Sequence, residues 1–97
     1  MTTVFEWDPA KAASNLRKHR ISFEVAQRAF LDPLAWTQED RFEHGEQRLR
    51  LLGMVDGSLL LVVAHTAREE GDLEIIRIIS ARAAEPKERR RYEDAIS

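Results

Sequence analysis

Two helical segments follow a short alternating run at the start of the chain. Residues 4–7 alternate apolar and polar positions, as a strand does. Asp8-Pro9 predicts the start of a helix that runs to about His19, because Asp accepts hydrogen bonds from free amides and proline needs no donor at the first helical position. Ser22 predicts a second helix start, and this helix is expected to end before Asp32-Pro33.

The residues of the first helix predict which side of it faces the protein. Ala13 and Leu16 are expected to turn inward. Lys11, Asn15 and Lys18 recur every three to four residues and are expected to share an exposed side.

From Leu34 onward the apolar period changes to that of strands. A brief strand is expected over residues 34–37, followed by a polar loop around residues 41–45. Two apolar runs, 48–54 and 59–66, flank an Asp-Gly pair, which is a strong β-hairpin pattern.

A second turn at residues 69–72 leads into the last strand, residues 73–80, which is apolar on both sides and is expected to be covered on both faces. Glu85-Pro86 predicts the start of a final helix that reaches about Ala95. The order β-α-α-β-β-β-β-α predicts an α+β fold, in which two N-terminal helices and a C-terminal helix pack against a mainly antiparallel sheet.

Length and composition favour one compact domain over residues 1–97, since 43% of the residues are hydrophobic and 33% are charged. The chain has no cysteine, and its three histidines are far apart, so we expect no disulfide, no structural metal and no cofactor. Residues 1–8 do not resemble a signal peptide, and the longest apolar run, residues 59–64, is too short to span a bilayer. We therefore expect a cytoplasmic protein with no membrane partner.

The net charge of −2 hides an uneven distribution. Basic residues concentrate between residues 77 and 91, whereas acidic residues gather at 39–43 and 69–72. A polyanion can bind one end of such a molecule although the whole is slightly negative.

Arg77 interrupts a run of isoleucines in the last strand, where a permanent charge is costly unless it is paired or solvated in a cleft. One interpretation is a buried ion pair with a carboxylate such as Glu69 or Glu74. The other is a cation that holds phosphate, together with Arg82 near the start of the final helix.

His65 and Glu69 lie where the preceding strand ends, roughly level with Arg77 if the two strands pair. An imidazole and a carboxylate beside two guanidinium groups suit general acid–base cleavage of RNA, with Arg77 and Arg82 stabilising the phosphorane. No metal is required, because the attacking 2′-hydroxyl belongs to the substrate. The alternatives are a His65 bonded to the backbone and a solvated Glu69.

The final helix has two interpretations. Arg89 with Glu93, and Arg90 with Asp94, are spaced as i,i+4 pairs that would neutralise an exposed helix. Alternatively, the helix binds phosphates, with Tyr92 stacking on a base or donating its hydroxyl.

Two blocks of sequence in the right order resemble the BrnT toxins. The opening block comprises residues 5–11 (FEWDPAK), 14–19 (SNLRKH) and 22–26 (SFEVA), and the closing block comprises residues 76–82 (IRIISAR) and 88–93 (ERRRYE). The resemblance covers residues 5–93. Residues 83–86 depart from it, because a more basic lead into the last helix is common there.

This resemblance implies a RelE-like fold and a single toxin domain with ribonuclease activity that arrests translation. It also implies a hetero-oligomer with a BrnA-like ribbon-helix-helix antitoxin, through which alone DNA would be contacted. The polar residues to which it points are Lys18, His65, Glu69, Arg77, Arg82 and Tyr92. With the basic helix, it predicts His65, Glu69, Arg77 and Arg82 as catalytic, and Lys18, Arg89 and Tyr92 as RNA-binding.

Two other functions remain open on the sequence. The arginines would also suit a non-enzymatic module that docks an acidic antitoxin. A single-strand RNA binder that uses Tyr92 and the basic helix would show salt-sensitive binding without cleavage products.

Overall fold

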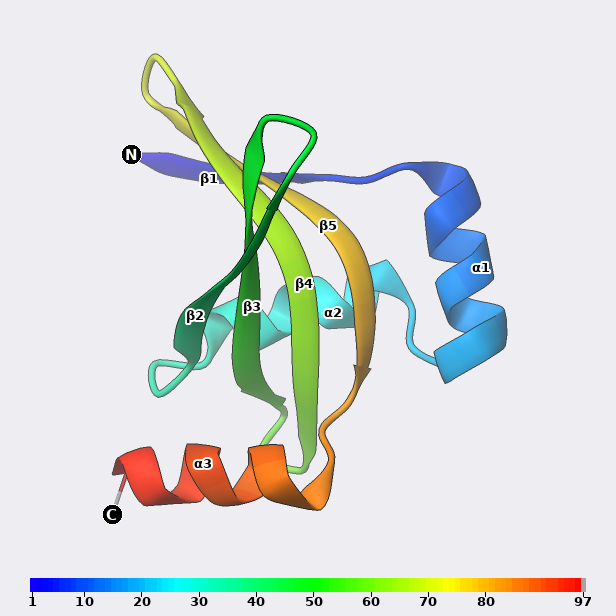
Figure 1. Ribbon diagram of the computed structural model, residues 1–97, viewed down its shortest axis with the longest axis vertical. Helices are drawn as coiled ribbons and strands as arrows, with labels where there is room; N and C mark the ends of the chain where they lie inside the picture. The colour runs from blue at the N-terminus through cyan, green and yellow to red at the C-terminus, as the bar shows by residue number, and fades with distance from the viewer. Residues whose placement is uncertain (97) are drawn as a thin grey trace.

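The computed structural model describes residues 1–96, in which a five-stranded sheet is combined with three α-helices and one 3₁₀ turn (Figure 1). The elements in chain order are β1 (Thr2–Glu6), α1 (Pro9–His19), α2 (Phe23–Arg28), the 3₁₀ turn η1 (Ala29–Leu31), β2 (Trp36–Glu43), β3 (Glu46–Val55), β4 (Leu59–Glu70), β5 (Leu73–Ala83) and α3 (Pro86–Ile96). The predicted order β-α-α-β-β-β-β-α and the α+β class are confirmed. None of the helices in residues 1–96 is long and apolar enough to cross a membrane.

The sheet has the strand order β1-β5-β4-β3-β2, in which β1 runs parallel to β5 and the other neighbours are antiparallel. The predicted Asp-Gly hairpin is confirmed. Val55 pairs with Leu59, and Asp56 and Gly57 have φ angles of 53° and 72°. Two consecutive positive φ angles suit the tight turns whose twist matches that of the strands.

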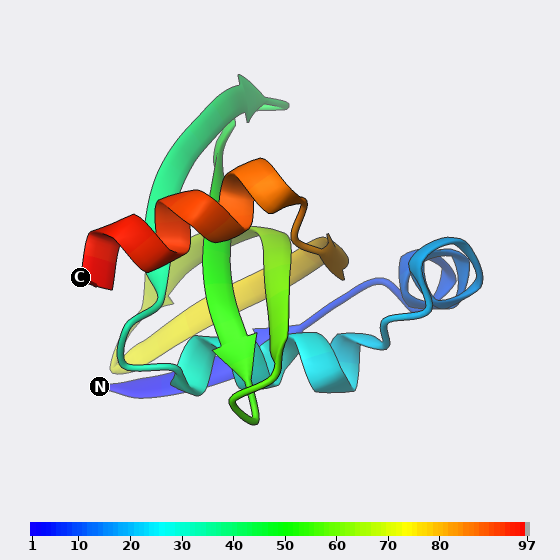
Figure 2. The ribbon, with the colours of Figure 1, turned by 90° about the horizontal axis from the view of Figure 1, so that it is seen from below.

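Helices lie on both sides of the sheet, but they cover it unequally (Figure 2). On one side, α2 and η1 cover the main core, which includes Phe23, Leu61, Val63 and Ile78, and α1 packs at the edge of β5. The approach is close at Gly53 of β3, where a Cβ atom would lie 2.6 Å from the Ala29 carbonyl oxygen of η1.

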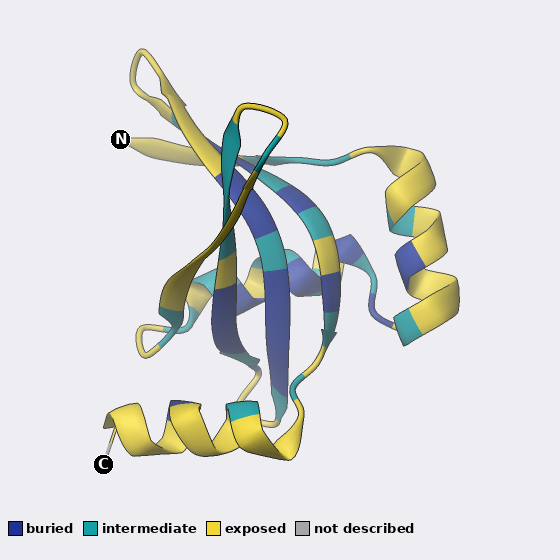
Figure 3. Ribbon diagram, viewed as in Figure 1, coloured by how far each residue is buried: buried dark blue, intermediate teal, exposed yellow. Residues whose placement is uncertain are grey.

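On the other side, α3 crosses only one end of the sheet, where Tyr92 packs with Leu52, Leu60 and Val62 (Figure 3). The Tyr92 hydroxyl donates to Asp32 Oδ2 at 2.6 Å, and the same carboxylate oxygen accepts from the Met54 amide at 2.8 Å. Asp32 therefore ties α3 to β3.

The prediction for β2 was wrong. The strand runs over Trp36–Glu43, through most of the expected polar loop, and only His44 and Gly45 form the turn. Because β2 is an edge strand whose exposed positions are polar apart from Phe42, it lacks the apolar alternation by which strands are recognised.

The predicted orientation of α1 was also wrong. Ala13 and Leu16 are exposed, Leu16 by 49%, whereas Asn15 is buried with 6% exposure. Asn15 Nδ2 donates to the Ala81 and Ile21 carbonyls at 2.8 and 3.0 Å, and its Oδ1 accepts from the Ala81 amide at 3.0 Å. A satisfied amide can be buried, so three hydrogen bonds outweigh the apolar preference of Leu16.

Candidate active site

The sheet face that carries α3, here called the open face, is left uncovered beyond the end of α3. The cross-strand row Trp36–Leu52–Val62–Arg82 lies at the covered end. The next row, Gln38–Arg50–Ala64–Ser80, lies where helical cover stops. Ala64 reaches only as far as Cβ, so the long side chains beside it enclose a hollow.

This hollow, here called the arginine pocket, has a volume of about 240 Å³. It is lined by Asp40, Arg41, Arg48, Arg50, Val62, Ala64, Ile79, Ser80 and Arg82. Four guanidinium groups and one carboxylate thus surround a floor of small and apolar side chains. Its lining is strongly cationic in a molecule of net charge −2.

Carboxylates hold the pocket arginines in place. Arg82 donates to both oxygens of Glu88, at 2.8 and 2.7 Å, and Glu88 also accepts from the Glu85 amide at the start of α3. The hydrogen bonds from Arg82 lower the pKa of Glu88 to about 2, and those with Glu88 raise the pKa of Arg82. Arg50 lies 3.3 Å from Asp40, on the opposite wall.

Arg48 is the most enclosed of these cations. Its side chain is 16% exposed and its Nη1 lies 3.5 Å from Glu43. Its buried Nε has no hydrogen-bond partner in residues 1–96. A buried N–H without an acceptor costs about 1–3 kcal/mol, so the enclosed position of Arg48 is energetically unfavourable.

Guanidinium groups on two walls of a pocket suit phosphate, because each presents a planar set of donors that matches two oxygens. Because Glu88 holds Arg82 and Asp40 contacts Arg50, the donors are positioned before an anion arrives. Preorganised donors stabilise charge that develops on a phosphoryl group.

Residues 7–88 match the family model described as "Ribonuclease toxin, BrnT, of type II toxin-antitoxin system". The chain belongs to the BrnT family. Its structure is similar to the 1.1 Å crystal structure of the Brucella abortus ribonuclease toxin BrnT, with a TM-score of 0.61 and 22% identity over 88% of this chain and 99% of that chain. At this identity the likeness shows the fold. A search of curated proteins by sequence gave no match. As a member of a type II toxin–antitoxin family, the chain has an antitoxin as its partner.

The open face contains two of the four residues that were predicted to be catalytic in this BrnT protein. Arg82 lines the arginine pocket, whereas Arg77 lies on the same face beyond it and donates to Glu46 at 2.5 Å. The interpretation of Arg77 as one half of an ion pair with a carboxylate is confirmed, but the partner is Glu46 rather than Glu69 or Glu74. Glu46 is the first residue of β3, and no local pattern indicates that this strand begins near Arg77.

A β-bulge at Ile79 places Arg77 and Arg82 on one face. Arg77 pairs with Thr66 and Arg82 with Val62, and the register shifts between these pairs. On a regular strand, two residues that are five positions apart point to opposite faces of the sheet. The extra residue at the bulge shifts this alternation by one position, so both arginines lie on the same face.

His65 does not join the arginines, so the expected cluster of His65 with Arg77 and Arg82 is wrong. It neighbours Thr66, which pairs with Arg77, and successive strand residues face opposite sides. The imidazole is 3% exposed and packs against Phe30, with 4.9 Å between ring centroids, and its Nδ1 donates to the Val63 carbonyl at 3.2 Å. Burial lowers the pKa of His65. The imidazole is therefore not accessible from the open face.

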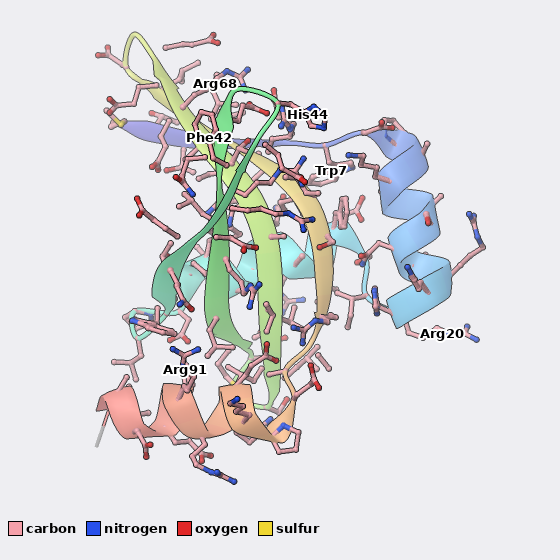
Figure 4. All side chains as sticks on the ribbon, viewed as in Figure 1. Trp7, Arg20, Phe42, His44, Arg68 and Arg91 are labelled. Carbon is pink, nitrogen blue, oxygen red and sulfur yellow. The ribbon has the colours of Figure 1, made fainter. Side chains whose placement is uncertain are left out.

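Glu69 also lies apart from the pocket. It pairs with Glu74 near the exposed tip of the β4–β5 hairpin, on the face opposite Arg77. Arg68, the residue before Glu69, is labelled at this hairpin, which lies at the end of the sheet away from α3 (Figure 4).

The predicted RNA-binding residues are dispersed. Tyr92 is 4% exposed, and burial together with the hydrogen bond to Asp32 raises its pKa to about 12, so its ring is not available to stack on a base. Arg89 is exposed on α3, and Lys18 lines a separate hollow beside α1. The neighbouring Arg91 instead lies over the Trp36 ring, 5.0 Å from its centroid (Figure 4).

Sequence reasoning missed Arg50, Asp40 and Ala64. Arg50 was findable, since the Asp-Gly turn fixes the hairpin register and so places Arg50 opposite Ala64. Asp40 was hidden because it lies in the part of β2 that was expected to be a loop.

Proposed function

We propose that this chain is the toxin of a type II toxin–antitoxin pair and a metal-independent endoribonuclease, which binds a phosphodiester of single-stranded RNA in the arginine pocket. The observation that carries the proposal is the arrangement of Arg48, Arg50 and Arg82 around the floor at Ala64, in a family described as ribonuclease toxins.

In the proposed reaction the 2′-oxygen of the RNA attacks the adjacent phosphorus and the bond to the 5′-oxygen breaks, which leaves a 2′,3′-cyclic phosphate. Arg50 and Arg82 hold the two non-bridging oxygens from opposite walls and stabilise the charge of the phosphorane. Asp40, the carboxylate in the pocket lining, takes the proton of the 2′-hydroxyl, and a water molecule protonates the leaving 5′-oxygen.

The lining supports a reaction that needs no metal. Its charged groups are four arginines and one carboxylate, a set that binds phosphate oxygens directly and offers few ligands to a divalent cation. In this mechanism His65 and Glu69 take no part, and Arg77 contacts a neighbouring phosphate from its place beyond the pocket.

We further propose that cleavage arrests translation in the cytoplasm and that a BrnA-like ribbon-helix-helix antitoxin neutralises the toxin. Any contact with DNA would then be made through the antitoxin. The whole chain acts as one toxin domain in this proposal.

The test is cleavage of labelled RNA by the purified protein in the presence of a chelator. Arg50→Ala and Arg82→Ala are each expected to slow cleavage by about 10²–10³-fold, as for loss of one donor to a developing oxyanion. Arg90→Ala, which removes an exposed cation of α3 outside the pocket, is the matched control and is expected to cleave normally. Cleavage that stops when the chelator is added would contradict the metal-independent mechanism, and cleavage unchanged in both pocket variants would contradict the site.

A further inference from the structure

A second basic hollow lies at the edge of β5, beside α1. Its volume is about 170 Å³, and it is lined by Lys11, Ser14, Asn15, Lys18, His19, Ile79 and Ser80. It is separate from the arginine pocket, but Ile79 and Ser80 line both hollows.

The strand pairing explains why this hollow exists. β1 pairs with β5 only as far as Arg77, so the following part of β5 has no strand on that side. Asn15 fills this place instead, because its side chain bonds to both the amide and the carbonyl of Ala81. A side chain is narrower than a strand, so space remains between α1 and the β5 edge.

The charges in this second hollow differ from those in the arginine pocket. No carboxylate lines it. Within residues 1–96, neither Lys11 nor Lys18 forms an ion pair, whereas Arg48, Arg50 and Arg82 each have a carboxylate within 4.0 Å. Two lysines that line the same hollow without a counter-charge favour the binding of an anion there.

The bulge connects the two hollows. Ile79 is the extra residue on β5, and the exposed Ser80 beside it faces the arginine pocket on one side and the lysines on the other. Bulges commonly occur beside active sites, where they redirect side chains. An extended polyanion can therefore pass from one hollow to the other over a single small hydroxyl residue.

From this geometry we propose that the hollow between α1 and β5 is a second phosphate-binding subsite, in which Lys11 and Lys18 hold the RNA backbone next to the phosphodiester in the arginine pocket. The inference rests on the proposed ribonuclease function. According to this inference, the substrate is an RNA strand that crosses the edge of β5 at Ser80. A dinucleotide is then too short to reach the second hollow and occupies only the arginine pocket.

The experiment compares the unaltered protein with the double variant Lys11→Gln/Lys18→Gln. Binding of a long, mixed-sequence RNA oligonucleotide with non-cleavable 2′-O-methyl sugars is measured by fluorescence anisotropy across a salt series. Each phosphate contact contributes a slope of about 0.7 in log K against log salt for single strands, so the double variant is expected to lose about 1.4 of the slope. Cleavage of a dinucleotide is expected to be unchanged.

Arg17→Gln together with Arg20→Gln is the matched control, since it removes two cations at the C-terminal end of α1 that do not line the hollow, and Arg20 points away from the sheet (Figure 4). It is expected to leave most of the slope intact. Circular dichroism confirms that both double variants are folded.

Three results would overturn the inference. The first is an unchanged salt slope of RNA binding in the lysine variant, and the second is an equal loss of slope in the arginine control. The third is loss of antitoxin binding with unchanged RNA binding in the lysine variant, which would make the hollow a protein-docking site. Failure of the proposed function itself looks different, because the unaltered protein would then cleave neither the dinucleotide nor a cleavable long RNA.

Discussion

Arg82 and Glu88 form a bidentate ion pair between the end of β5 and the first turn of α3, with nitrogen–oxygen distances of 2.8 and 2.7 Å. The pair joins the wall of the arginine pocket to the helix that closes its covered end. Its Glu88 side chain is only 18% exposed, so solvent screens it less than a surface pair.

Acid is therefore expected to weaken the fold through Glu88. The pKa of Glu88 is about 2 in the folded protein and 4.5 in its ordinary state. The unfolded chain therefore binds the proton first, so protonation favours unfolding. This stabilisation is complete above pH 4.5 and is lost as the pH falls towards 2. It is on the order of 1–2 kcal/mol after allowance for partial exposure. Thermal denaturation of Glu88→Gln across this range should show a smaller loss than the parent, and Glu93→Gln, an exposed carboxylate of α3, should behave as the parent does.

His65 is expected to affect stability rather than cleavage. Its folded pKa is below 6.5, so the unfolded chain takes up the proton first and stability declines as the pH falls below about 6.5. His65→Gln keeps an N–H donor for the Val63 carbonyl, should cost about 1–2 kcal/mol in lost packing against Phe30, and should flatten this decline. Urea denaturation at several pH values measures both effects.

The control for His65 is His44→Asn, at the exposed β2–β3 turn, because asparagine tolerates the φ of 52° found there (Figure 4). A folded His65→Gln protein that no longer cleaves RNA would show that the imidazole takes part in the reaction after all.

Ala64 is expected to determine access to the arginine pocket. Leucine at this position would fill the hollow above the floor while facing partly open space, so stability should change by no more than about 1 kcal/mol. RNA cleavage by Ala64→Leu should fall at least about tenfold, which corresponds to 1.4 kcal/mol of lost binding. Ala67→Leu, an exposed substitution three residues further along β4, should cleave normally, and equal activity in the two variants would show that RNA binds elsewhere.

Substitution of the polar Asn15 by alanine is expected to destabilise the fold more than substitution of the apolar Leu16, which is the reverse of the usual order. Asn15→Ala leaves the buried amide and carbonyl of Ala81 without their partner and should cost about 2–4 kcal/mol. Leu16→Ala removes a half-exposed side chain and should cost less than about 1 kcal/mol. The free energies of unfolding in urea test the pair, and a larger loss for Leu16→Ala would contradict the observed orientation of α1.

The element order was predictable because caps, turn residues and apolar periods are local features. Ser22 caps α2, Asp8 caps α1, and Asp56-Gly57 turns the β3–β4 hairpin, as each residue type indicates. β2 was not predictable, since an edge strand whose exposed positions are polar apart from Phe42 resembles a loop in composition.

The site was less predictable than the fold, because it depends on which face each side chain takes. Residues that are level along paired strands do not necessarily share a side of the sheet. The prediction that His65 meets Arg77 considered their level along the strands and not the face that each side chain takes. The bulge at Ile79 has no clear sequence signature, yet it decides that Arg82 lies on the side of Arg77. Asn15 was misjudged because its partners on β5 are 66 positions away in the chain.

Asp32 follows directly after η1, and its carboxylate holds both the Met54 amide and the Tyr92 hydroxyl. η1 itself lies against Gly53 on the opposite side of the sheet from α3. A Cβ atom at position 53 would lie 2.6 Å from the Ala29 carbonyl oxygen, so we expect any side chain there to push Ala29 away from β3 and, through the contacts of Asp32, to disturb α3. The helix that closes one end of the arginine pocket is therefore kept in position by the absence of a single methyl group on the far side of the sheet.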